Sequence, residues 1–154
     1  MLDTIDIKIL TALQNNCRRP ISETADLVGL SLSACHRRIG ILEKKGVIER
    51  YSARLNGEAL GYQMTFYVEV SLESQSESAL AAFEKAALTS PEVLECHLMT
   101  GTADYLIKVA APNTEDYERI YRRTLAALPH VSRIQSALVM KTIKRWNGYP
   151  PLKR

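Results

Sequence analysis

The chain of 154 residues has room for one ordinary domain or two small ones, and its 46% hydrophobic and 24% charged residues are typical of a folded protein. The formal net charge of only +3 excludes a histone-like polycation, and no apolar run approaches the roughly 20 residues that cross a bilayer. The N-terminus lacks the layout of a signal peptide, and the three cysteines form no metal-ligand pattern, so we expect a cytosolic protein.

Charge and hydrophobic period both change near residue 60. Residues 1–60 carry nine Lys/Arg and seven Asp/Glu, whereas residues 61–140 carry six and ten. The last fourteen residues carry five basic residues and no acid. The apolar spacing is helical before two nearby glycines and alternates between strand and helix after them. This pattern predicts one domain over 1–60 and a second over 61–154, which ends in a basic tail.

The first domain is predicted to contain a helix-turn-helix unit. Asp3 is placed to cap a first helix, Gly29 to stop a short second helix, and Ser31 to cap a third. The predicted helices cover residues 4–17, 22–29 and 31–45, followed by a linker strand or hairpin over 47–55. A short helix, a glycine turn and a longer helix are typical of DNA-binding domains.

The third helix is predicted to have a buried stripe and an exposed basic face. At 3.6 residues per turn the stripe comprises Leu32, Cys35, Ile39 and Leu42. Arg37 points away from this stripe with Ser33 beside it, and such residues suit a helix in the major groove. A basic helix face is often merely solvated, but the preceding glycine turn and cap favour DNA. The DNA-contacting candidates are Ser22, Ser31, Ser33, Ala34, His36, Arg37, Arg38 and Lys44.

The second domain is predicted to have the element order βαββαβ. The expected strands cover residues 64–72, 93–100, 104–110 and 131–143, and the expected helices cover 76–89 and 114–128. This order predicts an α+β chain with a ferredoxin-like antiparallel sheet and both helices on one face. The open face is a candidate interface, and by alternation it carries Thr65, Tyr67, Met99, Ala137 and Val139.

Several short motifs in both halves carry a family resemblance. They include Val28-Gly29-Leu30-Ser31, Gly46-Val47-Ile48, Glu95-Cys96-His97-Leu98 and Asp104-Tyr105-Leu106. In order and spacing, over nearly the whole chain, they resemble the Lrp/AsnC transcription regulators. The resemblance implies a winged helix-turn-helix domain, a linker strand and a C-terminal effector-sensing RAM domain. It also implies dimers that assemble further, often into octamers, and responses to free amino acids.

The same resemblance places the effector near the turn between the two middle strands, which the family often writes G-D-x-D. Here the turn keeps Gly101 and Asp104, but Thr102 and Ala103 depart from the family pattern, so the ligand's identity does not carry over. A plainer interpretation is that Gly101 makes a hairpin and Asp104 caps it. Thr100 and Ser136 are lesser candidates, because they are predicted to lie on neighbouring strands. The effector-binding candidates are Met99, Thr100, Gly101, Thr102, Ala103, Asp104 and Ser136.

These features predict a cytoplasmic, nucleoid-associated regulator that binds double-stranded DNA as a dimer, tetramer or octamer and responds to an amino acid. The sequence offers no catalytic string, phosphate-binding glycine loop or metal site, so we expect no enzyme activity, no cofactor and no membrane partner. Two alternatives stay open at this point. They are a sirohaem-type tetrapyrrole decarboxylase on the same scaffold and a nucleoid-organising protein of low specificity. The basic tail either touches DNA or, as is commoner, packs on a neighbour or stays loose.

Overall fold

The computed structural model describes residues 2–150, and its internal contacts divide the chain into two units. One unit contains the residues up to Arg54 together with the segment from Lys144 onward, and the other is Leu55–Ile143. No helix among the described residues is long and apolar enough to cross a membrane.

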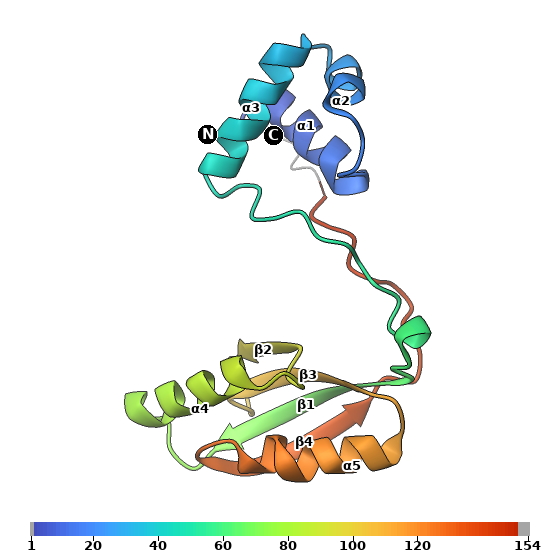
Figure 1. Cartoon of the computed structure of the whole chain (residues 1–154). Coiled ribbons are helices and arrows are strands. Elements are labelled where there is room, and N and C mark those ends of the chain that lie inside the picture. Colours follow the sequence, from blue (N-terminus) through green and yellow to red (C-terminus); the bar gives the residue numbers. More distant parts are fainter. Residues whose placement is uncertain (1, 151–154) are drawn as a thin grey trace. The chain divides into compact units, whose positions relative to one another are not determined.

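The first unit is built on three helices, which Figure 1 shows in blue to teal. They are α1 (Thr4–Asn15), α2 (Ile21–Val28) and α3 (Leu32–Lys44). Nearby residues determine where these helices begin or end. Asp3 and Asp6 form a reciprocal capping box at the start of α1, Gly29 ends α2 in the left-handed region (φ +73°), and the Ser31 hydroxyl accepts the Ala34 N–H at 3.3 Å. The three predicted helices are confirmed.

The core of this unit is small and continuous. Its buried members are Ile9, Ala25, Val28, Cys35, Ile39 and Leu42. The prediction for Leu32 was wrong, because its side chain lies at the first residue of α3 and is 57% exposed. The strand or hairpin predicted over 47–55 was also wrong. Those residues form no strand, because a strand needs a hydrogen-bonded neighbour and none is found among the described residues of this unit.

The second unit is a four-stranded antiparallel sheet with the strand order β2-β3-β1-β4 (Figure 1). Its strands are β1 (Met64–Leu72), β2 (Glu95–Leu98), β3 (Tyr105–Ala111) and β4 (Val131–Leu138). Its helices are α4 (Glu77–Thr89), α5 (Thr114–Arg123) and the short 3-10 turns η1 (Glu58–Leu60) and η2 (Leu125–Ala127). The βαββαβ order is confirmed, but the last strand is five residues shorter than predicted. It ends beside the first residues of β1, where the Val139 N–H donates to the Thr65 carbonyl at 2.9 Å.

Both helices pack on one face of the sheet. Alternate residues of β1, including Val68 and Val70, point toward α4 and α5 and are fully buried with Phe83 and Ile107. The intervening residue Tyr67 lies on the opposite face and is 40% exposed. The predicted two-faced sheet is therefore confirmed, with one face covered by helices and one open.

Candidate functional site

The outward face of α3 is the candidate DNA interface. Cys35, Ile39 and Leu42 anchor the opposite side of the helix in the core. Ser33 and Arg37 are both exposed, and they follow one another at the one-turn spacing that places them on the same face. The structure therefore presents a hydroxyl and a guanidinium in the N-terminal half of the helix, where a major-groove reader makes its base contacts.

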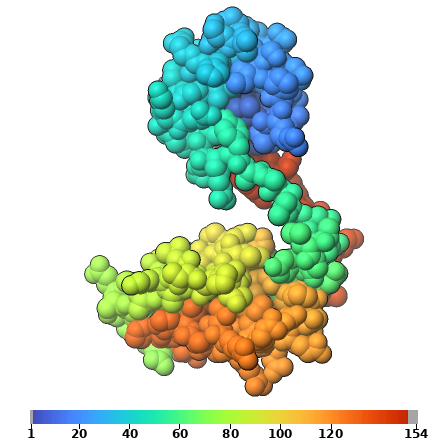
Figure 2. Space-filling view, viewed as in Figure 1, coloured from blue at the N-terminus to red at the C-terminus, as the bar shows by residue number. Residues whose placement is uncertain are grey.

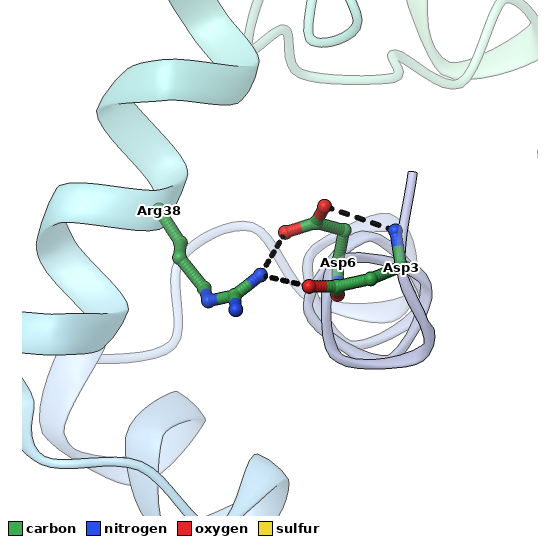
Figure 3. A network of polar contacts seen from close by, with 3 residues as sticks. All are labelled: Asp3, Asp6 and Arg38. Carbon is green, nitrogen blue, oxygen red and sulfur yellow. Dashed lines mark hydrogen bonds and ion pairs between the residues drawn. The ribbon is translucent and has the colours of Figure 1, made fainter. Parts of the chain in front are cut away.

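Arg38, a predicted DNA contact, forms ion pairs within its own unit. Figure 3 shows its guanidinium turned toward the start of α1, where Nη1 lies 2.6 Å from Asp3 Oδ2 and 2.8 Å from Asp6 Oδ1. The two carboxylates raise the pKa of Arg38 above its ordinary value. The pKa of Asp3 is lowered, chiefly by the hydrogen bond from the Asp6 backbone N–H and secondly by the hydrogen bond from the Arg38 guanidinium. Arg38 thus links α3 to the capping box of α1.

The other predicted DNA contacts have different surroundings: two take part in the cap of α3, one lines a cavity, and two are exposed at the ends of helices. Ser31 serves as the helix cap, and its hydroxyl also lies 3.3 Å from the Ser33 hydroxyl. Ala34 donates its N–H to that cap and is half-buried. His36 lines a shallow cavity of about 260 Å³ with residues that include Cys17. Two candidates at the margins are exposed, one in the first turn of α2 and one in the last turn of α3: Ser22 and Lys44.

The candidate effector turn joins β2 to β3 over residues 99–104. It is closed by the Met99 N–H, which donates to the Asp104 carbonyl at 2.8 Å. Gly101 has φ +142°, a backbone conformation that residues other than glycine rarely adopt. Among the described residues, no acceptor is found for the N–H groups of 100–103. A run of free N–H groups in a turn is a ready site for an anion such as a carboxylate.

Asp104 supports this turn from within the chain. Its Oδ2 accepts the Leu72 N–H at 2.8 Å, and its Oδ1 accepts a hydrogen bond from Gln75 Nε2 at 2.8 Å. Its own N–H donates to the Val70 carbonyl at 3.0 Å. Asp104 therefore joins the turn to the end of β1 and the loop before α4. Sequence reasoning missed Gln75, because no local pattern marks a loop glutamine as a partner of a distant carboxylate.

Ser136 is not brought to the turn within one chain. It was chosen as a residue on a neighbouring strand, but β4 pairs with β1, and β1 separates it from β3. Its hydroxyl instead accepts a hydrogen bond from the Tyr117 hydroxyl of α5. The remaining candidates, residues 99–104, are contiguous, and Met99 and residues 100–102 are exposed.

The comparisons with known proteins cover both units. Residues 2–49 match the winged helix-turn-helix DNA-binding profile, and residues 65–148 match the Lrp/AsnC ligand binding domain. The chain is 40% identical over 151 residues to the Bkd operon transcriptional regulator of Pseudomonas aeruginosa, covering 98% of both proteins. It is 37% identical over 146 residues to the leucine-responsive regulatory protein of Haemophilus influenzae, covering 95% of this chain and 88% of that protein.

The solved structures agree. A transcriptional regulator from Neisseria meningitidis, crystallised in complex with L-methionine, superposes with a TM-score of 0.92 at 33% identity, covering 97% of each chain. The curated relatives are transcriptional regulators and not enzymes, so the decarboxylase alternative is set aside. The chain belongs to the Lrp/AsnC family of DNA-binding transcriptional regulators, which carry an amino-acid effector domain.

Proposed function

We propose that α3 reads DNA in the major groove through Ser33 and Arg37, while Ser22 and Lys44 contact phosphates. The observation that carries this assignment is the division of labour between two adjacent arginines. Arg38 is held by two carboxylates of the same unit, whereas Arg37 is exposed and enters no ion pair among residues 2–150. An uncommitted guanidinium beside a small hydroxyl can bond a guanine edge in a bidentate manner.

The test is the substitution Arg37→Ala, measured by gel-shift titration on genomic fragments that the wild-type protein selects. A lost base contact is expected to weaken specific binding by about 1–3 kcal/mol and to relax the preference at one base position. The matched control is Lys85→Ala, an exposed cation on α4. Unchanged affinity in the Arg37 variant would refute the assignment. Footprints confined to a few phased sites support a specific regulator, whereas uniform protection supports the nucleoid-organising alternative.

The proposed effector is a free amino acid bound at residues 99–104. The unpaired N–H groups of 100–103 match an α-carboxylate, and the small Ala103 side chain leaves room for an apolar ligand side chain. The Neisseria regulator was crystallised with L-methionine, so this amino acid is the first to test. A thermal-shift screen of the common amino acids is expected to show stabilisation by one or a few of them. Equal curves with all of them contradict the proposal.

The proposed assembly pairs the open sheet face with that of a second copy. This face carries the exposed Tyr67 and Met99, and an apolar surface without a cover is typical of an interface. A symmetric dimer presents two α3 helices to successive major grooves, roughly 34 Å apart, so imperfect palindromic operators are expected. Light scattering is expected to give a dimer or a multiple of it. A monomer at micromolar concentration contradicts the assembly.

A further inference from the structure

The last described segment of the chain belongs to the DNA-binding unit. Strand β4 ends at Leu138, yet residues 144–150 group with the first unit. Figure 2 shows this red end of the chain lying against the blue part of the molecule. We call residues 144–150 the docked tail. Hydrogen bonds from two residues of the first unit, Gln14 and Arg54, hold the docked tail.

One side chain of α1 holds the docked tail through its main chain. Gln14 Nε2 donates to the Tyr149 carbonyl at 2.7 Å, and Gln14 Oε1 accepts the Tyr149 N–H at 3.0 Å. The amide thus makes the same two bonds that a paired strand residue makes. Gly148 fits this contact because it has φ +99°, which residues with a side chain rarely adopt, and because a Cβ there would collide with the Gln14 side chain.

A second contact fixes the other end of the docked tail. Arg54 Nη1 donates to the Trp146 carbonyl at 2.6 Å, and the rings of Trp146 and Tyr149 meet edge to face with centroids 5.7 Å apart. These hydrogen bonds use main-chain groups of the tail. None of them uses the charge of a tail residue, so the docking leaves the basic side chains free.

The docked tail carries cations toward a basic part of the unit. Lys144 and Arg145 are exposed, and neither enters an ion pair among residues 2–150. The last fourteen residues contain no acid that could neutralise them. Arg54 donates to the carbonyl of Trp146, the residue that follows Arg145, so a third cation lies beside them. Unpaired cations grouped in this way form the electrostatic footprint of nucleic-acid binding.

We propose that the docked tail is a second DNA-contacting element, which places Lys144 and Arg145 on the phosphate backbone beside the site read by α3. This inference rests on the proposed function of α3 as the reading helix. The neutral Gln14 anchor positions the cations without neutralising them. Phosphate contacts carry no base information, so the docked tail strengthens binding to any sequence and makes that binding more sensitive to salt.

The test measures the salt dependence of binding to a fluorescein-labelled duplex of mixed sequence by anisotropy. The slope of log affinity against log salt is negative, and each lost phosphate contact is expected to reduce its magnitude by about 0.9. The double variant K144Q/R145Q is therefore expected to reduce the magnitude by up to about 1.8 per bound subunit. Gln14→Ala and Gly148→Ala remove no charge, but they release the docked tail and are expected to lower the slope in the same direction. Lys85→Gln is the control, which removes a cation from α4 and leaves the slope unchanged.

The outcomes separate this proposal from the function on which it rests. If the wild-type protein and all variants share one slope, the docked tail does not touch DNA, although binding by α3 stands. If K144Q/R145Q lowers the slope and the Gln14 and Gly148 variants do not, the cations act without docking and the proposal is overturned. If the wild-type protein binds no duplex at all, the DNA-binding assignment itself fails. Circular dichroism melts check that each variant is folded, as expected for substitutions at an exposed Gln14.

Discussion

Substitution of Asp104 by alanine is expected to destabilise the second unit and to weaken effector binding together. The carboxylate holds two donors, the Leu72 N–H at the end of β1 and the Gln75 side chain, each at 2.8 Å. Leu72 is buried, so removal of the acceptor leaves its N–H short of a partner. The candidate effector turn ends at Asp104, so it loses this side-chain attachment to β1 and keeps only the main-chain bond from the Asp104 N–H to the Val70 carbonyl.

The magnitude follows from these two hydrogen bonds. A hydrogen bond to a charged acceptor contributes about 1.5–3 kcal/mol when it is shielded from water, and the exposed contact with Gln75 contributes less. We therefore expect Asp104→Ala to cost about 2 kcal/mol. For a domain of the size of Leu55–Ile143 this corresponds to a fall in Tm of roughly 8–16 °C. Asp104→Asn keeps one neutral acceptor oxygen, which can still accept the Leu72 N–H, so about half of that fall is expected.

Scanning calorimetry measures the transition of the second unit. The single tryptophan, Trp146, reports on the first unit through its fluorescence and separates the two transitions. Gln75→Ala is the control, since it removes only the exposed contact and is expected to change Tm little. A Tm for Asp104→Ala within about 2 °C of the wild-type value would show that the carboxylate does not hold the turn.

Two further predictions concern the effector turn and the start of α1. Gly101→Asp is expected to abolish the heat of amino-acid binding in calorimetry and to spare DNA binding, because the new carboxylate repels that of the ligand and φ +142° strains the turn. Normal binding heat in this variant contradicts the site. The lowered pKa of Asp3 stabilises the fold above its unfolded value of 3.8, and this contribution is lost as pH falls through the folded value. Acid unfolding by circular dichroism is therefore expected to be less steep below about pH 4 in Asp3→Asn than in the wild-type protein, and coincident curves would refute this.

Features with a local cause could be predicted from the sequence. The caps at Asp3 and Ser31 and the left-handed Gly29 depend on residues at most three positions away. The alternation in β1 likewise follows from one buried face and one open face. These elements fix the fold class, and the α3 surface with Ser33 and Arg37 follows from helical spacing alone.

Features that depend on distant partners could not be predicted in the same way. The sequence placed Arg38 at the margin of the reading face, but its partner Asp3 lies 35 residues away, and only folding brings the two together. Ser136 was misplaced because the order of strands in a sheet is not written in any one strand. The Gln14–Tyr149 contact spans 135 residues. It joins a side-chain amide to main-chain groups, and no sequence motif marks such a pair.

The docked tail makes the second unit an insertion within the first. The chain leaves the DNA-binding unit after Arg54 and returns to it at Lys144, so this unit is discontinuous in sequence. During synthesis α1, α2 and α3 emerge early and can pack at once, whereas Gln14 waits for its partner until residue 149 has been made. A truncation that removes the residues after Ile143 therefore leaves all four strands of the sheet intact. It removes contacts from the DNA-binding unit, although the helices of that unit are translated first.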